Sequence, residues 1–184
     1  MEAKRKVSTV TRLKPVEKVS KRRDEILQVA AELFAAKGYE ETTIREIGDA
    51  AGILSGSLYH HFGSTSDIVD AILREFCDEG LAGYREILAA GGDCFDVLHE
   101  MTHFAFAQVA ANAAAIVMLM NDSRELVQQE RFSYLVDYNH EIESHWVDTV
   151  RRGMDEGAVR ADLGDGLFYR FARGAIVSTR RWYD

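Results

Sequence analysis

The chain has 184 residues, 47% of them hydrophobic, and a formal net charge of −8. This is enough for one domain or two small ones with a buried core. No apolar run reaches the ~18 residues that a membrane span needs and no signal peptide opens the chain, so we expect a cytoplasmic protein without a membrane partner. Cys77 and Cys94 lack metal-ligand spacing, which favours free thiols.

Positive charge gathers at the start of the chain. Residues 1–66 hold 11 Lys and Arg against 9 Asp and Glu, whereas residues 67–184 hold 11 against 21. Residues 1–19 lack hydrophobic periodicity, and we expect them to form a disordered basic arm. Such an arm attracts DNA phosphates, although a solvated tail without a partner has the same composition.

The first expected helix runs from about Ser20 to Lys37 and stops at Gly38. Its first turn carries Lys21, Arg22 and Arg23, although a helix start disfavours cations. A bound anion, such as a DNA phosphate, would remove this conflict. The alternative is an exposed basic turn.

Two short helices are expected next. Thr43 and Glu46 form a capping box that starts a helix of about two turns. Gly52 supplies the left-handed residue that ends this helix, and Ile53 fills the corner before a second helix near Ser55 to His61. This spacing predicts a helix-turn-helix.

The second of these helices suits a DNA groove. Leu58 and Phe62 point inward, which leaves small, hydroxyl and aromatic side chains outside, where they can meet phosphates and thymine methyl groups. A short surface helix of an unrelated α-protein is the alternative. We expect DNA contacts from Thr43, Arg45, Ser55, Gly56, Ser57, Tyr59, His60, His61, Lys21 and Arg22.

These motifs carry a family resemblance. Thr43 to Ile47 together with Gly52 to Phe62 resembles the TetR family of one-component bacterial regulators. Two departures from the family pattern are Leu54, where many relatives have Ser or Thr, and Thr65, where many have Lys. A further likeness to the KstR-type repressors of steroid and cholesterol catabolism lies in Arg131 to Tyr134, Trp146 to Asp148, Arg160 to Leu163, Tyr169 to Phe171 and Arg181 to Tyr183.

The remaining chain predicts further helices. Ser64 and Asp67 form a capping box for a long helix from Thr65 to about Leu88, and Asp93 caps a helix that continues to about Ala110. Further helical stretches are expected over Asn112 to Leu119, from Arg124 to the Gly153–Gly157 region with a break near Glu130, and from Asp162 or Asp165 onward. With a single proline and few alternating runs, we expect an all-α fold, with a three-helix helix-turn-helix head and an antiparallel helical bundle.

The expected division is a DNA-binding domain over residues 20–64 and a ligand-binding and dimerisation domain over residues 65–184. The last helix has a broader apolar surface than one neighbour needs, which indicates a homodimer. The resemblance implies that relatives continue into a further helix beyond Asp184, so we expect either a smaller dimer surface or an incomplete sequence.

Candidate ligand-binding residues lie in the second domain. Bundle helices often enclose pockets, and aromatic and Met side chains suit a large apolar ligand, although most such residues are simply core. Arg173 either pairs with a carboxylate such as Asp137 or Glu141, or receives an anionic ligand. The resemblance implies an acyl-CoA thioester of a steroid fragment. The expected ligand-binding residues are Phe104, Met118, Tyr134, Tyr138, Trp146, Arg173 and Val177.

Other chemistry is weakly represented. His99 and His103 have the i, i+4 spacing of two metal ligands, with Asp96 nearby, but no third ligand motif follows. No nucleophile elbow, phosphate loop or paired-carboxylate pattern is present, so we expect no enzyme, cofactor or metal. The sequence therefore predicts a ligand-responsive repressor that binds double-stranded DNA, with a non-DNA ligand carrier or protein-interaction module as the alternative.

Overall fold

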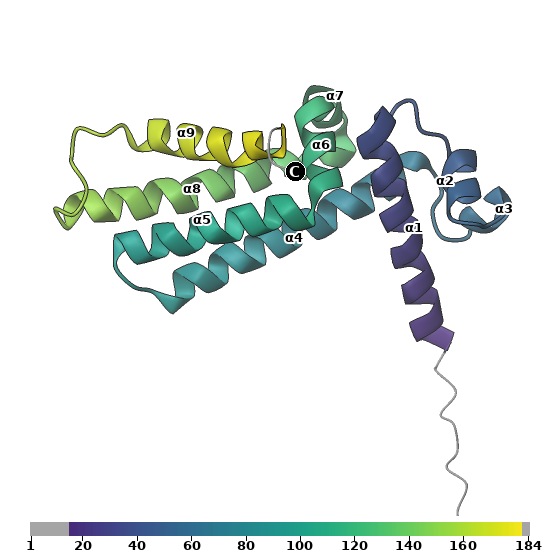
Figure 1. Ribbon diagram of the computed structural model, residues 1–184, viewed down its shortest axis with the longest axis horizontal. Helices are drawn as coiled ribbons and strands as arrows, with labels where there is room; N and C mark the ends of the chain where they lie inside the picture. The colour runs from purple at the N-terminus through teal and green to yellow at the C-terminus, as the bar shows by residue number, and fades with distance from the viewer. Residues whose placement is uncertain (1–14, 182–184) are drawn as a thin grey trace, which may run out of the picture.

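The computed structural model describes the backbone of residues 15–181 and the side chains of residues 21–54 and 56–180. This part of the chain contains nine α-helices, two 3-10 turns and no strand, so the all-α prediction is confirmed (Figure 1). The elements are α1 (Pro15–Lys37), α2 (Ile44–Ala50), α3 (Ser55–Leu58), α4 (Thr65–Ala90), α5 (Cys94–Ala111), α6 (Ala113–Asn121), α7 (Ser123–Val127), η1 (Glu130–Phe132), α8 (Tyr134–Asp155), α9 (Asp165–Ser178) and η2 (Thr179–Arg181).

Helices α1 to α3 form a head at one end of the molecule (Figure 1). Their inward side chains Ile26, Phe34, Ile47, Leu58 and Phe62 are all at most 4% exposed. The i, i+4 placement of Leu58 and Phe62 therefore buries one face of the α3 region, as predicted, and leaves its other faces free.

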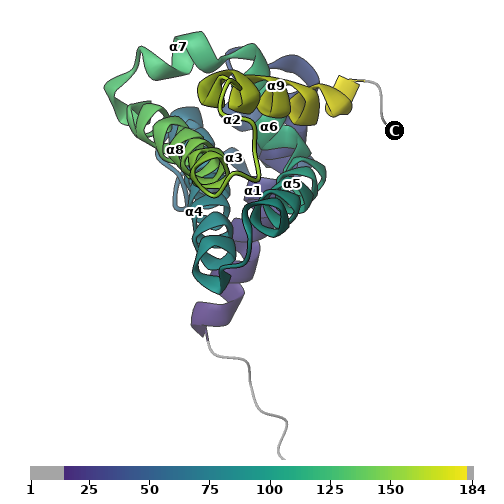
Figure 2. The ribbon, with the colours of Figure 1, turned by 90° about the vertical axis from the view of Figure 1, so that its left-hand side faces the viewer.

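Helices α4, α5, α8 and α9 form the body. Viewed along its length, α8 and α5 lie on opposite sides, with α4 below and α9 above (Figure 2). The long helix α4 starts next to the head and runs along the body, and α6 packs against α1. Helices α4 and α6 therefore join the two parts.

Two boundaries differ from the prediction. Helix α1 begins at Pro15 instead of Ser20, because proline is well suited to the first helical position, where its missing N–H costs nothing. Helix α3 ends at Leu58 instead of His61. The amide of His61 donates to the carbonyl of Leu58 at 2.9 Å, so the chain tightens into an i, i+3 turn. The part of the predicted basic arm before Pro15 lies outside the described residues.

Two glycines let the body helices approach α4 closely. A Cβ atom on Gly83 would lie 2.0 Å from Cζ of Phe104, and one on Gly80 would lie 2.8 Å from the hydroxyl of Tyr138. The sequence marks these glycines only as weak points of a helix. In the structure they are the positions at which α5 and α8 side chains fit against α4.

Helices α5 and α6 meet at a sharp bend. Their axes differ by 89° across Asn112. Within residues 15–181 no single helix is long and apolar enough to cross a membrane. Only α5 and α6 taken together reach the necessary length and apolar composition, and they are bent.

Candidate DNA-binding surface and effector cavity

The helix-turn-helix starts with the capping box that the sequence predicts. The Thr43 amide donates to Oε2 of Glu46 at 2.9 Å, and the Glu46 amide donates to Oγ1 of Thr43 at 3.3 Å. Lys37 of α1 also donates to the Glu46 carboxylate. The hydrogen bonds from Lys37 and then from Thr43 lower the pKa of Glu46 from 4.5 to about 2. The start of α2 is thus fixed both locally and against α1.

The turn between α2 and α3 depends on one glycine. Gly52 has a φ of 66°, in the left-handed region, and the Ile53 amide donates to the carbonyl of Gly48 at 2.9 Å. Leu54 stands at the α3 start with 84% of its surface exposed. Its carbonyl accepts from the Ser57 amide at 2.8 Å.

The predicted recognition surface is accessible. Gly56, Ser57, Tyr59 and His60 are exposed and His61 is half-buried, with Tyr59 at 58%. The side chain of Ser55 lies outside the described part. Because these residues are not packed inside the subunit, they are free to contact a DNA groove.

The predicted basic contacts differ in their surroundings. Lys21 is exposed, and Arg45 is 85% exposed with Asp49 at 3.9 Å. Arg22 instead donates to the carbonyl of Ala51 at 2.9 Å and pairs with Glu25 at 2.6 Å. Arg22 therefore connects α1 to the end of α2, and reaching a phosphate would cost it these bonds.

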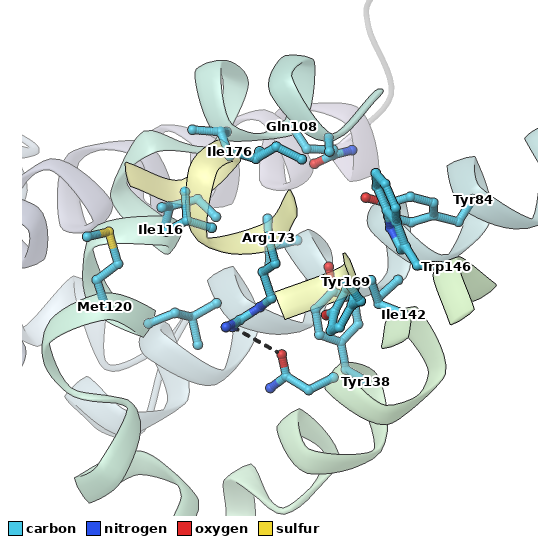
Figure 3. A pocket seen from close by; sticks show the side chains of 16 residues that line it. Tyr84, Gln108, Ile116, Met120, Tyr138, Ile142, Trp146, Tyr169, Arg173 and Ile176 are labelled. Atoms are coloured by element: carbon cyan, nitrogen blue, oxygen red, sulfur yellow. Dashed lines mark hydrogen bonds between the residues drawn. The ribbon is translucent and has the colours of Figure 1, made fainter. Parts of the chain in front are cut away.

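The body contains a cavity of about 120 Å³ (Figure 3). Its walls come from α4, α5, α6, α8 and α9, and they are mostly apolar with a few polar side chains. The lining residues are Phe76, Tyr84, Ala105, Gln108, Val109, Ile116, Leu119, Met120, Tyr138, Asn139, Ile142, Trp146, Tyr169, Arg173, Ile176 and Val177.

Four of the predicted ligand-binding residues line this cavity: Tyr138, Trp146, Arg173 and Val177. The other three lie elsewhere. Phe104 packs edge-on against Tyr84 with ring centroids 5.1 Å apart. Met118 is a core residue at 1% exposure, and the Tyr134 ring lies 4.1 Å from the guanidinium of Arg74.

Sequence reasoning missed several wall residues. Tyr84, Gln108, Asn139 and Tyr169 bring polar atoms to the cavity. Tyr169 lies four residues before Arg173, so the i, i+4 rule could have placed it on the same helix face. Tyr84 and Gln108 carried no comparable signal, because their positions depend on how α4 and α5 pack.

The cavity phenols are neutral hydrogen-bonding groups. Burial raises the pKa of Tyr84 to about 12 and raises those of Tyr138 and Tyr169 as well. They can therefore donate hydrogen bonds to a carbonyl or carboxylate at neutral pH.

Arg173 stands at an exposed edge of the cavity. Its guanidinium reaches Oδ1 of Asn139 at 3.5 Å (Figure 3). Glu141, one of the two carboxylates predicted as its partner, pairs with Arg85 at 2.6 Å instead. Among residues 21–180 no carboxylate lies within ion-pair distance of Arg173, so the carboxylate alternative is wrong here.

Two other features were singled out by the sequence. The rings of His99 and His103 lie 4.5 Å apart on the exposed face of α5. In the described part of the chain no group of three potential ligands could hold a metal. On α9, Leu167 and Phe171 are 55% and 72% exposed. Residues 182–184 lie outside the described part of the chain.

Comparisons with known proteins agree on one family. Residues 26–72 match the model for bacterial regulatory proteins of the tetR family. The chain is 42% identical over 164 residues to the HTH-type transcriptional repressor KstR2 of Rhodococcus jostii (strain RHA1), over 89% of this chain and 80% of that protein. It is 41% identical over 165 residues to KstR2 of Mycobacterium tuberculosis, over 90% of this chain and 82% of that protein.

A solved structure of the ketosteroid transcriptional regulator KstR2 of Mycobacterium tuberculosis superposes with a TM-score of 0.85 at 40% identity, covering 89% of this chain and 83% of that one. The identity thus extends over both the head and the body. The chain therefore belongs to the TetR family of bacterial regulatory proteins, within its KstR type, and is a transcriptional regulator rather than an enzyme.

Proposed function

We propose that the protein is a cytoplasmic repressor that binds a palindromic operator as a homodimer and releases it when an apolar, anionic effector enters the body cavity. The observation that carries this proposal is the combination, in one chain, of an exposed recognition surface around Tyr59 and a cavity edged by Arg173. The names of the relatives, a repressor and a ketosteroid regulator, favour a steroid-derived effector. The resemblance to KstR-type repressors implies that this effector is an acyl-CoA thioester.

A dimer would place two recognition helices on one face of the DNA. Half-sites are read when such helices stand about 34 Å apart, one turn of the duplex. The exposed apolar residues Leu167 and Phe171 of α9 supply a surface that a second copy could bury. Residues 20–64 would then read DNA, and residues 65–184 would set the separation of the two heads.

The size of the cavity supports a switch. At about 120 Å³ it has room for only ~4 waters, whereas sites for drug-sized ligands occupy about 300–1,000 Å³. A steroid-sized body can enter only if the walls move apart. The effector therefore binds a widened body better than this one, and such a difference in affinity shifts the equilibrium between two conformations.

The wall chemistry fits an effector with one apolar and one anionic part. Trp146, Ile142 and Ile176 provide apolar contacts. The Tyr hydroxyls can donate to carbonyl oxygens, and Arg173 at the exposed edge can pair with a carboxylate or phosphate.

A gel-shift experiment tests the proposal. The DNA is a fragment that carries a palindrome from the promoter next to the gene, and the probe is cholyl-CoA, a steroid CoA thioester. We expect a dimer-sized complex that disappears as cholyl-CoA is added. Persistence of the complex at saturating, demonstrably bound cholyl-CoA would contradict induction.

The role of Arg173 has a matched control on the same helix. Arg173→Gln should weaken cholyl-CoA binding about tenfold or more, because a hydrogen bond to a charged group is worth ~1.5–3 kcal/mol. Arg170 is exposed and does not line the cavity, so Arg170→Gln should change binding little. Equal effects of the two changes would show that only overall charge matters.

Salt dependence separates the proposal from a carrier or protein-interaction module. Operator affinity should fall steeply as salt rises, because bound phosphates release counterions. A head that docks on an apolar protein surface would show a shallow slope and no preference for the palindrome.

A further inference from the structure

Arg131 and Tyr134 flank Phe132 in a motif to which the proposed function assigns no role. Phe132 of η1 is fully buried and fixes this segment in the core. Nη1 of Arg131 lies 2.5 Å from Oδ1 of Asp67, in the first turn of α4. Although burial acts in the opposite direction, the pair with Arg131 lowers the pKa of the Asp67 carboxyl. The body thus holds the beginning of α4 by an ion pair.

A second contact lies one to two turns further along α4. The guanidinium of Arg74 stands 4.1 Å from the Tyr134 ring centroid, and its Nε donates to Oδ2 of Asp70 at 3.0 Å. The Tyr134 hydroxyl and Oδ1 of Asp70 are both buried without a hydrogen-bond partner. The contact of Tyr134 with Arg74 is made by its ring and does not need the hydroxyl.

These contacts lie where the head joins the body. Asp67 follows Phe62, a core residue of the head, by five positions. The Tyr39 hydroxyl, in the turn between α1 and α2, lies 3.0 Å from Oγ of Ser66. The contacts at Asp67 and Arg74 therefore hold the first turns of α4, the helix that leads out of the head.

We propose that Arg131 and Tyr134 are positioning residues whose contacts with Asp67 and Arg74, here called the latch, hold the head at the DNA-binding angle. The inference rests on the proposed function, since the latched form is the one with the small cavity. Effector binding, which requires wider walls, then opposes the latch.

Linkage gives the latch a distinctive signature. If it stabilises only the DNA-binding conformation, its loss favours the effector-binding one. Apparent affinity for the effector should then rise and affinity for the operator should fall, each by no more than the factor by which the conformational equilibrium shifts. A residue that merely stabilises the fold would not move these two affinities in opposite directions.

The test compares Arg131→Gln with Arg124→Gln in the full chain. Arg124 is an exposed arginine of α7 for which the described residues provide no ion pair, so it controls for charge. We expect Arg131→Gln to lower operator affinity and to raise cholyl-CoA affinity about threefold to tenfold, which lies within the range of typical coupling effects. The Arg131→Gln variant should also discriminate less than wild type against operators whose half-site spacing is changed by one base pair.

Further variants identify the partners. Asp67→Asn should reproduce Arg131→Gln, and the double variant should be no worse than either one, because all three lack the same pair. Arg131→Lys should restore part of the effect. Tyr134→Phe should leave both affinities unchanged, which would not hold if the hydroxyl bound the effector.

The outcomes separate the two proposals. If wild type fails to bind any palindrome, the proposed function falls and the latch with it. If wild type binds and responds but Arg131→Gln matches Arg124→Gln, or lowers both affinities together with the melting temperature, only the latch is overturned.

Discussion

The head and the cavity are built by different kinds of interaction. In the head, Thr43 caps with Glu46 three residues away, and Gly52 turns the chain by its own backbone conformation. In the cavity, Tyr84, Tyr138 and Tyr169 come from three helices that are remote in sequence. The reading surface therefore depends on short-range signals, whereas the effector site depends on packing. Substitutions in the two regions should therefore have different consequences for stability and for binding.

The largest effect is expected from close packing in the body. Gly83→Ala places a Cβ against the Phe104 ring, and we expect a loss of about 2 kcal/mol from overpacking despite the better helix propensity of Ala. Gly166→Ala in α9, where nothing lies within 4 Å of the added atom, is the control and should be neutral or stabilising. Urea unfolding measures both; equal stability would show that α4 and α5 separate at no cost.

A substitution on the predicted recognition surface should weaken DNA binding and leave the fold intact. Tyr59→Ala should reduce operator affinity about tenfold, equivalent to ~1.4 kcal/mol, because the ring is exposed on the predicted recognition surface. Ser57→Ala should have the same direction. Fluorescence anisotropy measures the affinity, and a thermal melt should show no more than a small shift. Unchanged affinity in both variants would refute the recognition surface.

Removing the N-cap of α2 should lower the stability of the protein. Thr43→Ala removes the side chain that accepts from the Glu46 amide and should destabilise the protein by about 1 kcal/mol. Thr43→Ser keeps the hydroxyl and should recover most of this. Denaturant unfolding of wild type and the two variants measures these differences. If Thr43→Ala is as stable as Thr43→Ser, α2 is held by packing alone.

The smallest effect is a pH dependence of the same cap. The pKa of Glu46 is lowered to about 2 by Lys37 and Thr43, from 4.5. Its contribution is therefore fully present above pH 4.5 and is lost as the pH falls toward 2. The stability gap between wild type and Glu46→Gln should shrink over that interval, while exposed Glu41→Gln should match wild type throughout. A gap that stays constant under acid would contradict this.

The predictions from sequence succeeded where a pattern has its cause nearby. The caps at Thr43, Ser64 and Asp93 and the turn at Gly52 were found because their hydrogen bonds span only two to five residues. The ligand residues were found only in part. Tyr134 has the composition of a pocket residue, yet it contacts Arg74 of α4, which no local pattern indicates.

The amino-acid order alone determined the helical character of the chain, the position of the head and which face of the α3 region points outward, since these follow from periodicity and caps. Only the tertiary structure decided that Gly83 receives Phe104, that Arg131 reaches Asp67 and that Arg173 stays without a carboxylate partner among the described residues. These contacts join residues from 21 to 64 positions apart in the sequence. Whether such residues meet depends on how the helices cross, and side-chain type does not encode that angle.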